Sequence, residues 1–307
     1  MLKLGIIGLS EGNGHPYSWS AIINGDYDER VMETCGFPVI PAYLKANRDT
    51  LGIDGAQVTH VWTQDRKISE HVAAASCIGN VADRMEDMIG QVDAVLLARD
   101  DPENHRKMAE PFLKENVPIF IDKPLAFNRD DLDYFAGQNE AGKFVMSCSA
   151  LRYSSGVQSA RAQMHDLGEI ELVVVVGNKD LRKYAIHYIE GMFSLLGDPT
   201  AKTVRHVNRS SGKDVLYIEF ENGTLATVHV FMDIAPGGEL NVYGRNGNLQ
   251  VDHGGAYPSF RSSLVEAIRS FQAGQPRLEF EKTYNVIRTL VGARESLAQG
   301  GKTVELC

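Results

Sequence analysis

The chain has 307 residues, of which 43% are hydrophobic and 23% charged, and its formal net charge is -9. This composition is ordinary for a globular protein long enough to form two domains. The acidic balance disfavours nonspecific binding to nucleic acid or to a membrane surface, and no apolar run approaches the roughly 18 residues that a membrane span needs.

The four cysteines are scattered through the chain without any C-x-x-C pair: Cys35, Cys77, Cys148 and Cys307. This spacing indicates neither a disulfide framework nor a cysteine-rich zinc site. The first nine residues lead directly into a strand pattern and do not resemble a leader peptide. We therefore expect a cytoplasmic protein with reduced thiols.

An apolar run from Leu2 to Leu9 predicts a buried first strand, followed by a glycine-bearing turn and a helix from about Tyr17. In a dinucleotide-binding fold this turn follows G-x-G-x-x-G, because its backbone approaches a pyrophosphate at the helix N-terminus. Gly8 and Gly12 suit such a turn, but Ser10 stands where the second glycine belongs. Its hydroxyl could still meet a phosphate, although its Cβ limits close approach.

A long segment, residues 25–57, separates this helix from the second predicted strand, Val58 to Thr63. We interpret it as an insertion that covers the cofactor site, contacts the other domain or serves an interface, or else as a tolerated surface excursion. After the second strand, Asp65 would bind the ribose hydroxyls of NAD, whereas Arg66 could accept the 2'-phosphate of NADP. Asp65 is also a candidate N-cap of the next helix.

The stretch from Val92 to Phe127 predicts strand, helix and strand. Its first strand leads to Asp100, and its second ends in Asp122-Lys123-Pro124. Ligands of an open parallel sheet bind beyond such carboxyl ends, so we expect Lys123 to face a crevice. The alternative is a solvated lysine at the end of a strand. Another helix and strand would complete a first domain at residues 1–149.

After Ser149 a strand-rich pattern replaces the alternation of strand and helix, which marks a second domain at residues 150–307. We expect an α/β protein: an N-terminal Rossmann domain with a doubly wound parallel sheet, and a C-terminal α+β domain with a large, mostly antiparallel sheet. That second sheet would carry the interface of a homodimer or homotetramer. The predicted strands are Glu171 to Gly177, Thr203 to Asn208, Asp214 to Glu221, Gly223 to Phe231, Glu239 to Gly244 and Asn248 to Asp252.

The run from Asp122 to Ala126, with His105 upstream, resembles the Glu-Lys-Pro region of the glucose-fructose oxidoreductase, inositol dehydrogenase and rhizopine-catabolism (Gfo/Idh/MocA) family. The resemblance implies an oxidoreductase that transfers a hydride between NAD or NADP, with NAD slightly preferred, and a CH-OH group of a sugar or cyclitol. It implies that Lys123 is catalytic. The residues that it places near the cofactor are Gly8, Ser10, Gly12, Asp65, Arg66, Asp100, His105, Asp122 and Lys123.

In the second domain, the segment from Lys179 to Gly197 predicts an amphipathic helix with His187 at its head. Relatives carry Asp-x-x-x-His-x-x-Asp here, and the histidine accepts the proton of the alcohol. In this chain Lys183 replaces the first acid and Glu190 the second, so the charge beside the expected base is reversed. Asp180 is the nearest substitute for the missing acid.

The resemblance gives Lys183 and His187 catalytic positions and places four residues on the substrate: Arg152, Tyr153, Tyr184 and His187. His187 could instead be a buried histidine that bonds a carbonyl. No serine-nucleophile elbow and no metal-ligand spacing of histidines is present. Two other functions stay open: a glycosidase that uses bound NAD in a transient oxidation, and a noncatalytic binding or regulatory protein, which Ser10 and Lys183 suggest.

Overall fold

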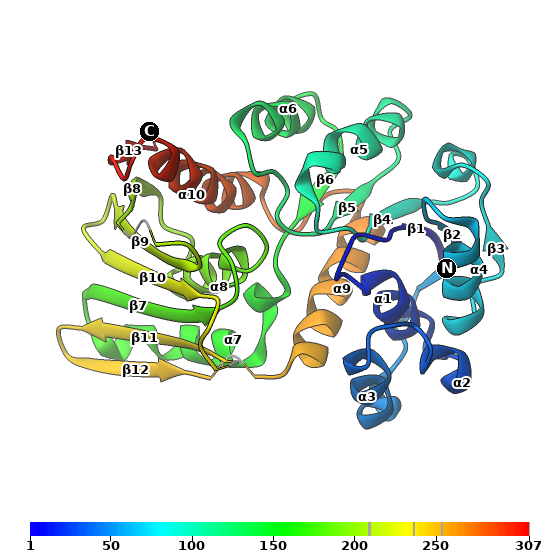
Figure 1. The fold of residues 1–307 in the computed structure, drawn as a ribbon, viewed down its shortest axis with the longest axis horizontal. Helices are drawn as coiled ribbons and strands as arrows, with labels where there is room; N and C mark the ends of the chain where they lie inside the picture. The colour runs from blue at the N-terminus through cyan, green and yellow to red at the C-terminus, as the bar shows by residue number, and fades with distance from the viewer. Residues whose placement is uncertain (208–209, 236, 253, 307) are drawn as a thin grey trace. The chain divides into compact units, whose positions relative to one another are not determined.

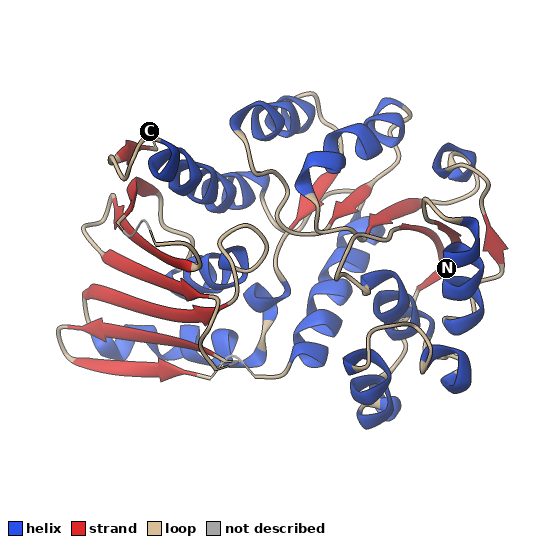
Figure 2. Cartoon of the chain, viewed as in Figure 1, coloured by secondary structure: helices blue, strands red, loops and turns tan. Residues whose placement is uncertain are grey.

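The computed structural model describes residues 1–207, 210–235, 237–252 and 254–306, and Figures 1 and 2 show the course of the chain and its secondary structure. The chain forms two compact units, each built from several segments. The first unit comprises Met1–Leu125, Tyr134–Ser147 and Phe260–Phe280; the second comprises Ala126–Asp133, Cys148–Ser259 and the chain from Glu281 onward. The predicted boundary after Ser149 is close to one of these divisions, but the sequence did not predict that the first unit is discontinuous.

The first unit contains a parallel sheet of six strands in the order β3-β2-β1-β4-β5-β6. The strands are β1 (Leu2–Ile7), β2 (Ala56–Trp62), β3 (Asn80–Val81), β4 (Ala94–Leu97), β5 (Ile119–Ile121) and β6 (Val145–Ser147). Every residue of β4 and β5 is buried, as expected for strands that are covered on both faces. The strand order reverses between β1 and β4, where ligands of doubly wound sheets bind. This confirms the predicted Rossmann sheet.

Helices surround this sheet: α1 (His15–Asn24), α2 (Glu29–Met32), α3 (Val39–Ala46), α4 (Arg66–Ala75), α5 (His105–Lys114) and most of α6 (Arg129–Glu140) and α9 (Ala256–Ala273). The 3-10 turns are η1 (Arg48–Thr50), η2 (Met85–Met88) and η3 (Pro102–Asn104). The predicted insertion contains α2, α3 and η1. It packs on the glycine turn, because a Cβ added at Gly14 would lie 2.5 Å from Ile40 Cδ1 and 2.7 Å from Phe37 Cδ2.

Most of α9, orange in Figure 1, belongs to the first unit, although most strands of the second unit precede it in sequence. The ring of Phe271 lies 5.3 Å from that of Phe144. Arg261 Nε donates a hydrogen bond of 2.6 Å to the carbonyl oxygen of Thr50. The apolar pattern predicted this helix, but a helical pattern does not specify which sheet the helix joins.

The second unit contains a sheet of seven strands in the order β12-β11-β7-β10-β9-β8-β13, red in Figure 2. Among the described residues β7 and β10 pair in parallel and the other neighbouring strands are antiparallel, which confirms the predicted mostly antiparallel sheet. The strands are β7 (Ile170–Asn178), β8 (Ala201–His206), β9 (Lys213–Phe220), β10 (Leu225–Phe231), β11 (Gly238–Gly244), β12 (Gly247–Val251) and β13 (Val304–Glu305). Asn208, where one predicted strand ended, lies outside the described residues.

The remaining elements are η4 (Ala150–Tyr153), α7 (Ser155–Gln163), η5 (Met164–Leu167), α8 (Ala185–Leu196) and α10 (Phe280–Ala298). Burial alternates along β10, as expected for a strand with one face on a core. Of the predicted thiols, Cys307 lies outside the described residues; the other three are in the thiol form. No helix in the described part of the chain is long and apolar enough to cross a membrane.

Candidate functional site

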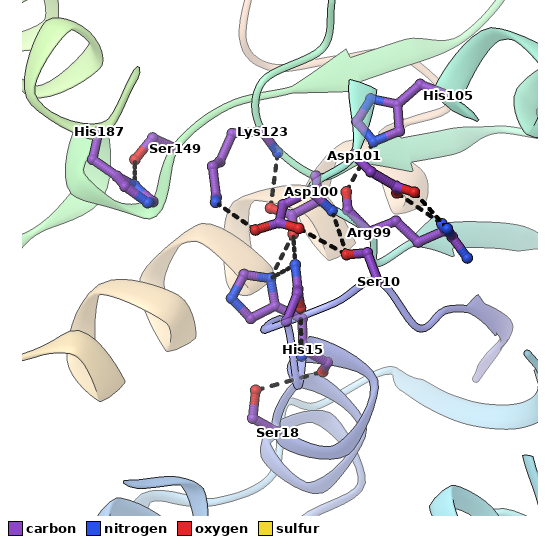
Figure 3. Close-up of polar contacts among 12 residues, drawn as sticks. Ser10, His15, Ser18, Arg99, Asp100, Asp101, His105, Lys123, Ser149 and His187 are labelled. Carbon is purple, nitrogen blue, oxygen red and sulfur yellow. Dashed lines mark hydrogen bonds and ion pairs between the residues drawn. The ribbon is translucent and has the colours of Figure 1, made fainter. Parts of the chain in front are cut away.

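Lys123 directly follows β5 and is buried, with 5% of its surface exposed. Its Nζ lies 3.6 Å from Oδ2 of Asp100, which follows the neighbouring strand β4. Ser10 Oγ donates a hydrogen bond of 2.7 Å to Asp100 Oδ1 (Figure 3). The three side chains come from the ends of three adjacent strands, as the parallel sheet predicts. The alternative of a solvated lysine is therefore wrong.

Asp122 is also buried and connects three neighbours. Its Oδ2 accepts hydrogen bonds from His15 Nδ1 at 2.5 Å and from Asn13 Nδ2 at 2.9 Å, and its Oδ1 accepts one from the Lys123 N–H at 2.8 Å. Burial alone would raise the pKa of this carboxyl group. The charge and hydrogen bond of His15, together with Lys123 and Asn13, outweigh burial and lower the pKa of Asp122 to about 2.

His15 is the first residue of α1, and it was not among the site residues predicted from the sequence. Its ring stacks on Trp19 at 4.7 Å and meets the edge of Phe260 at 4.9 Å. With Nδ1 held by Asp122, the ring has a fixed orientation, and 15% of the side chain is exposed. The His-Pro pair at the start of the helix, just after the glycine turn, is the signal that could have identified it.

Two side chains clamp the backbone of the glycine turn at Leu9. Gln64 donates from Nε2 to the Leu9 carbonyl at 2.7 Å and accepts from the Leu9 N–H at 3.1 Å. Arg99 Nη1 donates to the same carbonyl at 3.0 Å, while its Nε and Nη2 bind both oxygens of Asp101. The turn is therefore fixed from the ends of β2 and β4, by residues that no sequence motif indicated.

The predicted turn glycines differ in their surroundings. A Cβ added at Gly8 would lie 2.2 Å from Pro16 Cγ, so this position requires glycine. Gly12 has a φ of +77° and nothing within 4 Å of an added Cβ, so its backbone is open to a ligand. Its conformation also favours glycine.

Asp65 caps α4, because its Oδ1 accepts a hydrogen bond of 2.8 Å from the Lys67 N–H. Arg66 is exposed and pairs with Glu70 at 2.9 Å and with Asp83. The cap that we considered for Asp65 is thus present, and the ribose and 2'-phosphate contacts of Asp65 and Arg66 stay predictions. Beside them is a cavity of about 310 Å³ that is lined by Trp62, Asp83, Arg84, Met85, Glu86, Asn104, Lys107 and Met108.

His105 was predicted to contact the cofactor, but its ring is completely buried. Nε2 lies 2.9 Å from the carbonyl oxygen of Arg99, and Nδ1 lies 3.1 Å from that of Leu125. The imidazole therefore joins the loop after β4 to the loop after β5. The ring has no exposed surface in this structure, and its two hydrogen bonds give it a role in holding these loops together. The predicted cofactor contact of His105 stays a prediction.

In the second unit, His187 is half-buried in the first turn of α8. Its Nδ1 and the Ser149 hydroxyl share a hydrogen bond of 2.7 Å (Figure 3), and the ring of Tyr184 lies 5.8 Å away. Asp180, considered as a substitute acid, accepts a hydrogen bond of 2.8 Å from the Lys183 N–H within its own turn. A neutral hydroxyl thus holds the imidazole, and Ser149 was not among the predicted site residues.

Glu190 and Arg152 form a buried ion pair, with 1% and 3% of their surfaces exposed. Arg152 also binds both oxygens of Asp198, at 3.1 and 2.8 Å. Burial raises the pKa of Glu190, although the charge of Arg152 opposes this effect. Because its guanidinium is held by two carboxylates, we assign Arg152 to the framework of this unit. The predicted substrate contact of Tyr153, which is half-buried in η4, stays a prediction.

Comparison with known proteins identifies the first unit. Residues 35–147 match the model of an oxidoreductase family with an NAD-binding Rossmann fold. Over these residues, most of which belong to the first unit, the chain is similar to the Rossmann domain of that family. This match begins after the glycine turn, so Ser10 and His15 lie outside it.

Solved structures of this fold cover the whole chain. The myo-inositol dehydrogenase from Lactobacillus casei, in complex with NAD(H) and myo-inositol, is 16% identical with a TM-score of 0.78, covering 99% of this chain and 96% of that chain. A probable dehydrogenase from Thermotoga maritima is 14% identical with a TM-score of 0.77, covering 99% of both chains. The structural similarity shows that the chains share a fold.

A curated relative matches more locally. The proposed oxidoreductase subunit of UDP-kanosamine synthase from Amycolatopsis mediterranei (strain S699) is 30% identical over 71 residues, which are 23% of this chain and 20% of the relative. This chain departs from the Gfo/Idh/MocA pattern described above at Ser10, Asp122, Lys183 and Glu190. Within the described residues, no group of three histidine, cysteine or acidic side chains could hold a metal ion.

Proposed function

We propose that the protein is an NAD- or NADP-dependent oxidoreductase that transfers a hydride between nicotinamide and a secondary alcohol or ketone carbon of a sugar or cyclitol. The observation that carries this proposal is the buried Lys123, which Asp100 holds at the carboxyl end of β5 in a domain of an oxidoreductase family. The Lactobacillus casei enzyme of the same fold, whose complex contains both NAD(H) and myo-inositol, supports a polyol substrate.

The first unit contains residues of the chemical types that would hold a dinucleotide. The open backbone of Gly12 allows the close approach that a pyrophosphate requires. The cavity beside Arg66 and Asp83 would take the adenosine end of the cofactor, with Asp65 or Arg66 near its ribose. When bound, the nicotinamide supplies the hydride acceptor for oxidation or the hydride donor for reduction.

The side chains of this chain would provide binding and proton transfer. Lys123 would donate a hydrogen bond to the reacting oxygen and stabilise the negative charge that develops on it. His187 would accept the hydroxyl proton in oxidation and return it in reduction. Ser149 would orient His187 through the hydrogen bond that they share.

Reduced-nicotinamide absorbance tests this proposal with NAD or NADP and a panel of inositols, sugars and nucleotide-activated sugars. We expect turnover of at least one polyol, and Lys123→Ala should lower kcat by about 10²- to 10³-fold, the typical loss for one donor to a developing oxyanion. Lys114→Ala is the matched control, because this lysine is exposed on α5 and pairs with Glu110. Equal loss in both variants would contradict the role of Lys123.

A noncatalytic binding protein is the second candidate. It is favoured by the hydrogen bonds that hold the glycine turn closed on itself, such as the one from the Asn13 N–H to the Ser10 carbonyl at 3.1 Å. Calorimetry with NAD and with NADP separates the two candidates. Binding of either cofactor supports the oxidoreductase, and binding of neither supports the alternative.

A further inference from the structure

Some of the backbone N–H groups of the glycine turn and of the following helix are already paired. Rossmann domains bind a pyrophosphate largely through N–H groups of this turn and the following helix. In this chain several of these groups have partners within the turn or from neighbouring loops, and Pro16 has no N–H at all. The paired groups are the N–H of Leu9 with Gln64 Oε1, of Asn13 with the Ser10 carbonyl, of His15 with Asn13 Oδ1, and of Tyr17 with the Gly14 carbonyl.

Two buried carboxylates beside the turn also repel an anion, as far as neighbouring cations such as Lys123 do not offset them. Asp100 and Asp122 are both buried at the edge of the turn, with 5% and 2% of their surfaces exposed. Coulomb repulsion between a carboxylate and a phosphate is strong at such short range and low solvent exposure. A donor that carries a positive charge would offset it and would bind a phosphate oxygen more strongly than a neutral N–H.

His15 has the geometry of such a donor. Its Nδ1 is held by Asp122, while Trp19 and Phe260 pack against the ring and fix its plane. Apart from the partners of Nδ1, the described residues offer this ring no hydrogen bond, so Nε2 is available to a ligand. The side chain reaches the surface beside the open backbone of the turn.

We propose that His15, oriented by Asp122, binds a phosphate oxygen of the dinucleotide through Nε2–H. This inference rests on the proposed function and deepens it. An imidazolium donates from both nitrogens, to Asp122 on one side and to the phosphate on the other. A neutral ring with its proton on Nδ1 would instead present a lone pair to the phosphate. Cofactor binding therefore takes up a proton.

The groups that surround His15 do not account for the proton that is taken up on cofactor binding, so we assign this proton to the His15 ring. Asp122 and Asn13 face Nδ1, and the aromatic rings of Trp19 and Phe260 carry no titratable group. Asp122, with its pKa of about 2, stays ionised throughout the neutral range. Lys123 and Asp100 continue the same network at 3.6 Å from one another.

Isothermal titration calorimetry of the full chain with NAD, in buffers of different protonation enthalpy, measures the proton uptake. We expect the wild-type protein to take up as much as one proton when it binds NAD, and Kd to rise with pH. His15→Gln should abolish the uptake and weaken binding about 10- to 100-fold at low pH, the loss of one charge-assisted hydrogen bond.

His60→Gln is the matched control. His60 lies on β2 in the same unit, and its Nδ1 is 2.9 Å from Thr59 Oγ1, away from the turn network. This variant should keep the wild-type proton uptake and Kd. Asp122→Asn is the second test variant, since it keeps His15 but removes the carboxylate that favours its cation, so proton uptake should shift to lower pH.

The outcomes are distinct. Proton uptake that is lost in His15→Gln and shifted in Asp122→Asn supports the inference. NAD binding that does not depend on pH, or equal uptake in His15→Gln and wild type, overturns it and leaves the oxidoreductase proposal standing. If His15→Gln does not fold, unchanged uptake in Asp122→Asn overturns the inference. If wild-type protein binds neither NAD nor NADP, the proposed function fails and this inference fails with it.

Discussion

The two units hold their candidate functional side chains by different means. In the first unit, buried carboxylates hold the groups proposed to meet ligands: Asp100 binds Lys123, and Asp122 binds His15. In the second unit a neutral hydroxyl, that of Ser149, holds His187. The buried acid nearest to it on the same helix pairs with an arginine of the framework. The candidate ligand-binding groups are thus held by charge in the first unit, and the candidate base is held by a neutral group in the second.

The largest effect should come from the ion pairs of the second unit. Arg152→Met would leave Glu190 and Asp198 buried without a cation, and we expect the free energy of unfolding to fall by about 3 to 5 kcal/mol. Urea denaturation at neutral pH measures this loss. The difference in free energy of unfolding between Arg152→Met and wild type should become smaller in acid, because protonation of Glu190 and Asp198 removes the buried negative charges.

An exposed arginine is the control for that experiment. Arg245 pairs with Glu169 and Glu171 on the surface, with 62% of its side chain exposed, and Arg245→Met should change stability by less than about 1 kcal/mol. If Arg152→Met lowers the free energy of unfolding as little as Arg245→Met does, another group compensates for the charges of Glu190 and Asp198. The proposed difference in how the two units use buried charge would then be wrong.

The charge of Asp122 should have the next largest effect. Its pKa falls from 3.8 to about 2 on folding, and each pKa unit corresponds to about 1.4 kcal/mol. The ionised group thus contributes about 2 kcal/mol, which is fully present above the unfolded pKa and is lost as the pH falls from about 4 through 2.

Asp122→Asn should therefore lower the free energy of unfolding at neutral pH by about 2 kcal/mol and flatten its fall in acid. Chemical denaturation of both proteins across this pH range provides the measurement. An unchanged acid dependence in the variant would show that the carboxylate is not held in its ionised form by His15.

The smallest effect should come from the hydroxyl that holds His187. Ser149→Ala removes the hydrogen bond to His187, worth about 1 kcal/mol, and also the cap that the hydroxyl forms with the Leu151 N–H at the start of η4. From the loss of the His187 contact we expect kcat to fall about fivefold while the affinity for the cofactor is unchanged. Ser149→Thr retains the hydroxyl and should retain the rate. Equal rates in the alanine variant and wild type would argue against His187 as the residue that exchanges the proton.

Local patterns were enough to predict Lys123, but they did not reveal its partners. An apolar run that ends in a lysine before Pro124 places that lysine at the end of a strand, and the alternation of strand and helix predicts a parallel sheet. The ion pair with Asp100 follows from the strand order. It could be anticipated only after the sheet was correctly assembled.

The site residues that local patterns missed or misassigned depend on contacts between distant parts of the chain. Ser149 precedes His187 by 38 positions and lies in a different element, and the partner of His15 is 107 positions away. Arg152 was assigned to substrate from family position alone, whereas its two acidic partners decide its role. Single-sequence patterns describe neighbours in the chain and not such pairings.

The discontinuity of the first unit has a consequence for synthesis on the ribosome. Residues Phe260 and Phe271 of α9 pack on His15 and Phe144, so the hydrophobic core of the nucleotide-type domain contains a helix that is translated after β7 to β12 of the other domain. This core cannot be completed while the nascent chain is still short. A protein truncated after Ser149 would expose the apolar surface that α9 covers, and it should aggregate or associate with chaperones.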